Sequence, residues 1–154
     1  MRLRDYQTEQ FIPQPLPDVF AFFSNAQHLS DLTPPWLHFH ILTPTPILMQ
    51  AGTLIDYRLR LFGMPVRWRS AITVWEPLDR FVDVQLRGPY RQWVHEHLFT
   101  EFSGGTLVRD RIVYAVLGGP LEPLVHHWLV AKRLREIFAY RRERLAQRLT
   151  PTPN

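Results

Sequence analysis

The chain has 154 residues, of which 45% are hydrophobic and 13% aromatic, which suits one globular domain with a substantial core and excludes a disordered chain. It contains no cysteine, so disulfide bonds, thiolate catalysis and thiolate metal sites are excluded. The net charge of +4 comes from arginines, several of them interleaved with glutamates near the C-terminus, and no nucleic-acid-binding motif accompanies them, so we expect no nucleic-acid partner.

The first third of the sequence predicts short elements separated by prolines. Residues 1–5 are charged and lack the apolar stretch of a secretory signal, and no apolar run approaches the ~18 residues of a membrane span. We therefore expect a cytoplasmic protein without stable membrane insertion. Residues 4–12 alternate as a strand, residues 18–23 and 27–32 suit two short helices, and residues 38–42 suit a short strand. Pro44 and Pro46 then predict a stiff loop.

Residues 52–76 predict a β-hairpin with one apolar and one arginine-rich face. Gly63 and Met64 lie between two alternating runs, and a glycine in the first of two loop positions favours a type II′ turn. The resulting pairs are Leu59 with Trp68, Tyr57 with Ser70 and Ile55 with Ile72 on one face, and Arg60 with Arg67 and Arg58 with Arg69 on the other. The arginine side must face solvent or an acidic neighbour such as Asp56, because like charges directly opposite are unfavourable.

Two further turns set the register of residues 80–116. A tight turn at Gly104 and Gly105 pairs His95 with Tyr114, His97 with Ile112 and Phe99 with Asp110. The turn at Gly88 and Pro89 allows two registers: a two-residue loop pairs Trp93 with Val84, and a three-residue loop pairs Trp93 with Gln85 and His95 with Asp83. We favour the longer loop, because the adjacent glycine and proline suit a looser corner. The inner face then combines large aromatic and titratable side chains, as a small-molecule pocket does.

Residues 120–149 predict one long amphipathic helix that closes this pocket. Pro120 suits a first helical turn, and apolar residues recur at three- and four-residue steps from Leu121 to Leu149. We expect this stripe to pack against the sheet, with Trp128 or Phe138 reaching a ligand. Residues 1–149 are predicted to form a single domain, with residues 150–154 as a flexible tail.

The order of these elements resembles the SRPBCC superfamily, also described as START-like or birch-pollen-allergen-like. Residues 68–114 carry the most specific likeness, in the segments Trp-Glu-Pro at 75–77, Phe-Val-Asp-Val-Gln at 81–85, Gly-Pro-Tyr at 88–90, Trp-Val-His-Glu-His-Leu-Phe at 93–99 and Asp-Arg-Ile-Val-Tyr at 110–114. This is similar to a bacterial subgroup described as polyketide cyclase/dehydrase-like or coenzyme-Q-binding-like. The resemblance spans nearly the whole chain. It implies an α+β helix-grip fold, in which a curved seven-stranded antiparallel sheet wraps around the C-terminal helix and two short helices join strands 1 and 2.

The first functional hypothesis is the binding of a hydrophobic or aromatic molecule, such as a lipid, quinone or polyketide-like compound, between sheet and helix. The side chains expected at this ligand site are Tyr57, Leu59, Trp68, Ser70, Ile72, Asp83, Gln85, Trp93, His95, His97, Phe99, Asp110, Ile112, Tyr114 and Trp128. We expect no cofactor. A homodimer is left open.

Two alternatives use the titratable residues of this face differently. In a cyclase or dehydratase, His95 oriented by Asp83 would act as a general base, and Tyr114 would donate to an oxyanion. In a metal protein, His95 and His97 with Asp110, or His38 and His40, would supply ligands. Two-residue histidine spacing is a weak signal, so we expect no metal.

Overall fold

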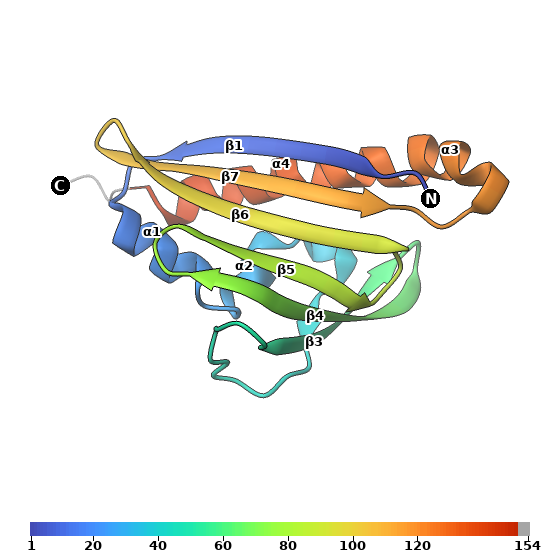
Figure 1. Ribbon diagram of the computed structural model, residues 1–154, viewed down its shortest axis with the longest axis horizontal. Coiled ribbons are helices and arrows are strands. Elements are labelled where there is room, and N and C mark those ends of the chain that lie inside the picture. Colours follow the sequence, from blue (N-terminus) through green and yellow to red (C-terminus); the bar gives the residue numbers. More distant parts are fainter. Residues whose placement is uncertain (151–154) are drawn as a thin grey trace.

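The computed structural model describes residues 1–150 and confirms the expected α+β helix-grip fold. Seven antiparallel strands form one sheet in the order β1-β7-β6-β5-β4-β3-β2 (Figure 1). The strands are β1 (Arg4–Ile12), β2 (His40–Ile41), β3 (Leu54–Leu61), β4 (Met64–Glu76), β5 (Arg80–Arg87), β6 (Gln92–Phe102) and β7 (Gly105–Ala115). The predicted tail lies outside the described residues from residue 151 onward.

Two short helices, α1 (Leu16–Phe23) and α2 (His28–Leu32), connect β1 to the rest of the sheet, as the proline-bounded segments predict. Pro17 lies in the first turn of α1, where its missing N–H costs no hydrogen bond. A short 3-10 helix (Pro35–Leu37) follows and ends at His38, whose φ of 48° is left-handed. This conformation keeps His38 out of the sheet, so β2 is shorter than the predicted strand at 38–42.

The β3–β4 hairpin has the predicted faces but a different loop. Its loop residues are Phe62 and Gly63, with φ values of 52° and 75°, which is the type I′ conformation. The register therefore moves by two residues, and Tyr57 pairs with Trp68 where we predicted Ser70. A two-residue shift preserves the side-chain alternation, so the inner face is correct while the pairs are not. The new pairs place Asp56 opposite Arg69, and the two form an ion pair at 2.8 Å.

The β6–β7 hairpin differs from its prediction in the same way, because its loop is Ser103 and Gly104, with φ values of 50° and 78°. His97 therefore lies opposite Asp110, and His95 lies opposite Ile112. The longer loop between β5 and β6 is confirmed, and it pairs His95 with Asp83. Together these registers gather two histidines and two aspartates across three adjacent strands.

The C-terminal segment is helical but not one uninterrupted α-helix. It consists of a 3-10 turn (Gly119–Leu121), α3 (Glu122–Val125), a π-helical segment (His126–Val130) and α4 (Ala131–Arg148). Figure 1 shows α4 running lengthwise behind β1 and β7 and α3 extending past the sheet. A π turn holds one residue more than an α turn, so it rotates the preceding apolar residues away from the α4 stripe. As a result Trp128 is 70% exposed and does not line the cavity described below, whereas Phe138, the other residue expected to reach a ligand, does line it.

Two apolar clusters form the core between sheet and helices. The first includes Ile12, Val19, Phe20, Phe23, Leu32, Phe81, Phe99, Val108 and Leu145. The second includes Leu59, Trp68, Trp93, Ile112, Tyr114, Leu134 and Phe138. His97 stacks on Phe81 of the first cluster, with ring centroids 4.1 Å apart, and His95 lies 5.9 Å from Phe138 of the second. The polar side chains of β5, β6 and β7 therefore lie between two apolar regions.

Candidate functional site

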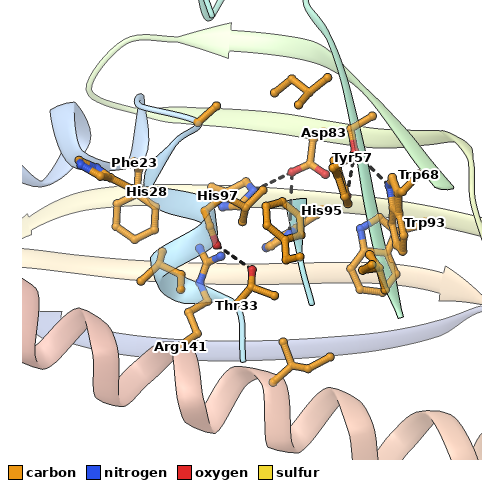
Figure 2. Close-up of a pocket in the computed structure, with 18 of the residues that line it drawn as sticks. Phe23, His28, Thr33, Tyr57, Trp68, Asp83, Trp93, His95, His97 and Arg141 are labelled. Carbon is orange, nitrogen blue, oxygen red and sulfur yellow. Dashed lines mark hydrogen bonds and ion pairs between the residues drawn. The ribbon is translucent and has the colours of Figure 1, made fainter. Parts of the chain in front are cut away.

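A cavity of about 220 Å³ lies between the sheet, α2 and α4. Its wall is mostly apolar and aromatic, and its polar residues include Asn25, His28 and Thr33 near α1 and α2 as well as two groups on the sheet (Figure 2). The predicted residues that line it are Tyr57, Leu59, Trp68, Ser70, Ile72, Asp83, Trp93, His95 and His97. These side chains come from β3, β4, β5 and β6, whose inner faces the alternating sequence pattern identified.

The other predicted residues do not line this cavity. Phe99 and Ile112 are buried in the two core clusters, and Asp110 lies behind the histidines. Gln85 accepts a hydrogen bond from the backbone N–H of Tyr90 and donates one to its carbonyl, which holds the β5–β6 corner together. The hydroxyl of Tyr114 forms a 2.7 Å hydrogen bond with His126, beyond the cavity wall.

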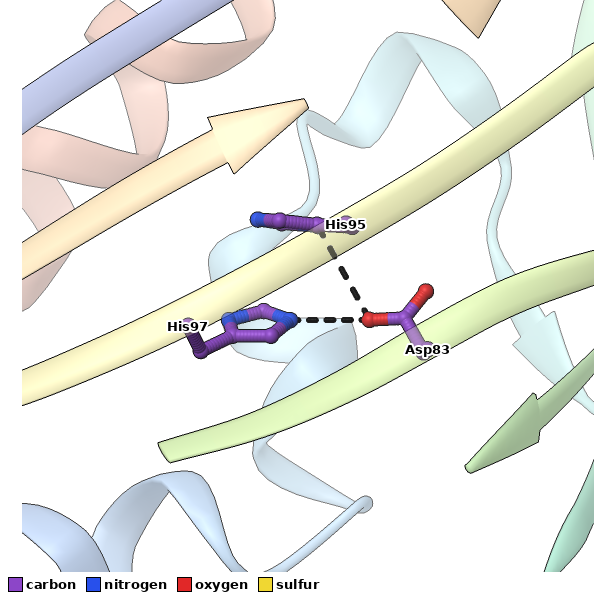
Figure 3. A group of neighbouring side chains, drawn as sticks. All are labelled: Asp83, His95 and His97. Carbon is purple, nitrogen blue, oxygen red and sulfur yellow. Dashed lines mark hydrogen bonds and ion pairs between the residues drawn. The ribbon is translucent and has the colours of Figure 1, made fainter. Parts of the chain in front are cut away.

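The main polar group of the site consists of Asp83, His95, His97, Asp110 and Arg141, which we call the buried polar cluster. His97 Nε2 lies 2.8 Å from Asp83 Oδ2, and His95 Nε2 lies 2.7 Å from Asp110 Oδ1. The remaining ring nitrogens point the other way, with His97 Nδ1 3.3 Å from Asp110 Oδ1 and His95 Nδ1 3.9 Å from Asp83 Oδ2. The two imidazoles stack with their centroids 3.7 Å apart, and Figure 3 shows both beside the Asp83 carboxylate.

This arrangement corrects the predicted dyad. We expected Asp83 to orient His95, whereas the short contact of His95 is with Asp110, and Asp83 holds His97. Because a carboxylate only accepts, the 2.7 Å contact with Asp110 places a proton on His95 Nε2 and leaves Nδ1 as a lone pair. The trio of His95, Asp83 and Tyr114 is not brought together, since the Tyr114 hydroxyl pairs with His126.

Burial and charge set the protonation of the cluster. Burial alone would raise the pKa of Asp110, but Arg141 and the hydrogen bonds from both histidines hold that pKa well below its ordinary value. Burial likewise opposes ionisation of Asp83, whose pKa is lowered by the hydrogen bond from His97 and by nearby positive charge. Burial and the charge of His97 lower the pKa of His95. The pKa of His97 is raised despite burial, because it faces both carboxylates.

Arg141 is the functional residue that sequence reasoning missed. We grouped it with the solvated arginines of the C-terminal helix, yet it is 7% exposed and lies 3.4 Å from Asp110 Oδ1. Its guanidinium also lies over the rings of Phe23 and Phe138, at 5.3 and 5.8 Å. The spacing of Arg141 could have indicated its burial, because it follows the helical steps of the buried residues on one face of α4, which are Leu134, Phe138 and Leu145.

A second polar group lies at the hairpin end of the cavity. Trp68 Nε1 donates to Ser70 Oγ at 3.1 Å, and the Tyr57 hydroxyl lies 3.4 Å from the same oxygen. Burial raises the pKa of Tyr57, so its hydroxyl stays neutral. This end of the site therefore offers satisfied, uncharged groups beside the aromatic rings of Trp68 and Trp93, which meet edge to face at 5.4 Å.

Other proteins share this architecture. The protein TTHA0849 from Thermus thermophilus is 21% identical, with a TM-score of 0.64 over 94% of this chain and 99% of the other. Major latex-like protein 151 from Panax ginseng is 11% identical, with a TM-score of 0.71 over 97% and 99% of the two chains. The Zhui aromatase/cyclase from a Streptomyces species, R1128, is 12% identical, with a TM-score of 0.70 over 96% and 94%. At these identities the likeness shows the fold alone.

The sheet, the helices and the cavity between them define a protein of the helix-grip fold. The family described as polyketide cyclase / dehydrase and lipid transport matches residues 12–139, and the chain belongs to this family. This confirms the superfamily recognised from residues 68–114. No curated protein matches the chain in sequence. Within residues 1–150, no helix combines the length and apolarity needed to cross a membrane.

Proposed function

We propose that the protein binds a compact apolar or aromatic molecule in the cavity between the sheet and α4. The observation that carries this proposal is the cavity itself, whose volume of about 220 Å³ is enclosed mainly by apolar side chains. An apolar cavity of ~150 Å³ accepts benzene, so this one suits a ligand of one or two rings. Such pockets typically combine an apolar wall with a few polar groups that fix orientation.

The aromatic and the polar parts of the cavity wall suit different parts of a ligand. The aromatic end, with Tyr57, Trp68 and Trp93, suits a ring, because edge-to-face and stacked contacts favour aromatic partners. The other end presents Asp83 and His95, which suit one polar atom of the ligand. The volume of about 220 Å³ suits a compact ring compound.

The experiment is to identify what the protein carries and to block the cavity. Native mass spectrometry and solvent extraction of purified protein are expected to show a small apolar molecule, or binding of an added naphthalene-type fluorescent probe. Leu59→Trp should abolish probe binding, because Leu59 lines the cavity and an indole would fill it. Leu86→Trp is the matched control, since Leu86 is 59% exposed. Equal binding by both variants, with no bound molecule in the native protein, would refute the proposal.

A further inference from the structure

Within the buried polar cluster, three groups converge on one point. One ligand atom from each of Asp83, His95 and His97 lies within 4.8 Å of the other two. The Asp83 oxygen is 2.8 Å from His97 Nε2 and 3.9 Å from His95 Nδ1. A point equidistant from three atoms with these separations lies about 2.0–2.4 Å from each, close to the ~2.0–2.2 Å of metal bonds to imidazole and carboxylate.

The far side of the His95 imidazole is held by a carboxylate as in metal sites, and the same carboxylate faces the far side of His97 without a hydrogen bond. Asp110 Oδ1 lies 2.7 Å from His95 Nε2 and 3.3 Å from His97 Nδ1, so one carboxylate faces the distal nitrogen of each ring. Metal-bound histidines commonly donate their other N–H to such a carboxylate, which fixes the tautomer and aims the lone pair. His95 Nδ1 and His97 Nε2 both point at Asp83. The 2.8 Å contact with Asp83 places a proton on His97 Nε2, so metal binding at this nitrogen would release that proton.

Charge and access also suit a cation. Arg141 lies beside Asp110 and offsets its charge, so once a metal ion displaces the protons that face Asp83, the Asp83 carboxylate is left to balance the cation. The Asp83 side chain is 19% exposed, against 8% and 6% for His95 and His97. All three residues line the cavity, so an ion could enter there and keep a coordination position facing it.

We infer that Asp83, His95 and His97 bind one divalent transition-metal ion, with Asp110 as a positioning residue. Two imidazoles and one carboxylate suit zinc or iron(II), whereas calcium and magnesium prefer oxygen ligands alone. With only three protein ligands, the ion would keep a position open toward the cavity, where water or a polar atom of a bound molecule could coordinate. This inference does not rest on the proposed apolar ligand, because the site is defined by the protein's own side chains.

The test is metal binding by full-length protein purified without affinity resin. Elemental analysis should find zinc or iron, and protein stripped with EDTA should take up one equivalent of Zn²⁺ or of Co²⁺, with visible Co²⁺ absorption typical of bound nitrogen ligands. Asp83→Asn is nearly isosteric and should weaken Co²⁺ binding at least about tenfold. Asp110→Asn should keep one equivalent but weaken binding by about 10–100-fold.

The matched control is the double variant His38→Ala with His40→Ala, which removes the other two histidines that are spaced two residues apart. It should bind Co²⁺ as the wild type does, because these residues lie outside the cavity wall. Circular dichroism of each metal-free variant checks the fold. The inference is overturned if stripped wild-type protein takes up neither Zn²⁺ nor Co²⁺ stoichiometrically. It is equally overturned if Asp83→Asn binds as tightly as wild type, or if only the His38 and His40 variant loses the ion.

Discussion

Arg141→Met tests whether the buried polar cluster depends on the charge that α4 supplies. Methionine keeps most of the length and apolar packing of the side chain, while the guanidinium beside Asp110 is lost. Arg141 and Asp110 retain only 9% and 7% of their side-chain exposure, so water cannot replace the missing partner. The variant would therefore leave Asp110 buried with the histidines as its remaining partners.

The expected loss of folding stability in Arg141→Met follows from the free-energy cost of breaking a buried ion pair. Removing one partner typically costs ~3–5 kcal/mol, because the other charge stays desolvated. Here the loss should be smaller, about 2–4 kcal/mol, since His95 and His97 still face Asp110 and since the unpartnered Nε of Arg141 disappears with the guanidinium.

The measurement is urea unfolding of metal-free protein in EDTA at pH 7, with Arg135→Met as the matched control. Arg135 is exposed on the same helix, so its variant should change the free energy of unfolding by no more than ~0.5 kcal/mol. A loss for Arg141→Met no larger than that of the control would refute the reasoning.

The pH dependence of the difference in free energy of unfolding between Arg141→Met and the wild type tests whether the loss is electrostatic. The folded pKa of Asp110 is held low, so the ionised carboxylate stabilises the wild type above the ordinary aspartate pKa, and this contribution disappears as the pH falls through the folded pKa. Without Arg141, burial raises the pKa of Asp110. The difference between variant and wild type should therefore narrow as the pH falls toward and below ~3.9. A constant difference from pH 7 to pH 3 would show that the loss is not electrostatic.

Three further variants test the packing, the turns and the cavity boundary. Leu134→Ala should lower the free energy of unfolding by ~2–5 kcal/mol in urea titrations, because Leu134 is 2% exposed. A loss below ~1 kcal/mol, which is about the contribution of one buried methylene group, would contradict its core position. Gly104→Ala should lower the free energy of unfolding by ~1–2 kcal/mol because of the φ of 78° alone, since open space surrounds the position of the added Cβ. An unchanged melting temperature would argue against the type I′ loop. Trp128→Ser should leave both stability and probe affinity unchanged, and weaker probe binding would restore Trp128 to the site.

The fold could be predicted because alternation and turn residues report on it directly. The faces of β3 and β4 followed from the contrast between Tyr57, Leu59 and the arginines, a contrast that a two-residue slip leaves intact. The exact pairs could not be predicted, because two hairpin loops have a non-glycine residue at positive φ before the glycine. Phe62 and Ser103 are not residues that ordinarily signal a type I′ turn.

Those parts of the site that follow from the alternation of side chains along the strands could be predicted from the sequence. Those parts that depend on the strand register or on the C-terminal helical segment could not. Asp83, His95 and His97 were placed on the inner face, whereas the contact of His95 with Asp110 depends on the β6–β7 register, which differs by two residues from the predicted one. Arg141 was missed because a charged residue on a helix is usually solvated, and only its carboxylate partner on β7 explains its burial. Trp128 was misplaced because the sequence gives no sign of the π-helical segment.

The position of the buried polar cluster between the two apolar clusters has a consequence for how such a protein can change its ligand. Both clusters contribute to the cavity wall, the second through Leu59, Trp68 and Leu134 and the first through Phe23, Leu32 and Phe81, whereas Ile12, Phe20 and Leu145 do not line the cavity. Distant substitutions without shared partners act almost independently. Exchanges at cavity-lining positions could therefore alter the proposed ligand site while Ile12, Phe20 and Leu145 preserve the stability of the domain.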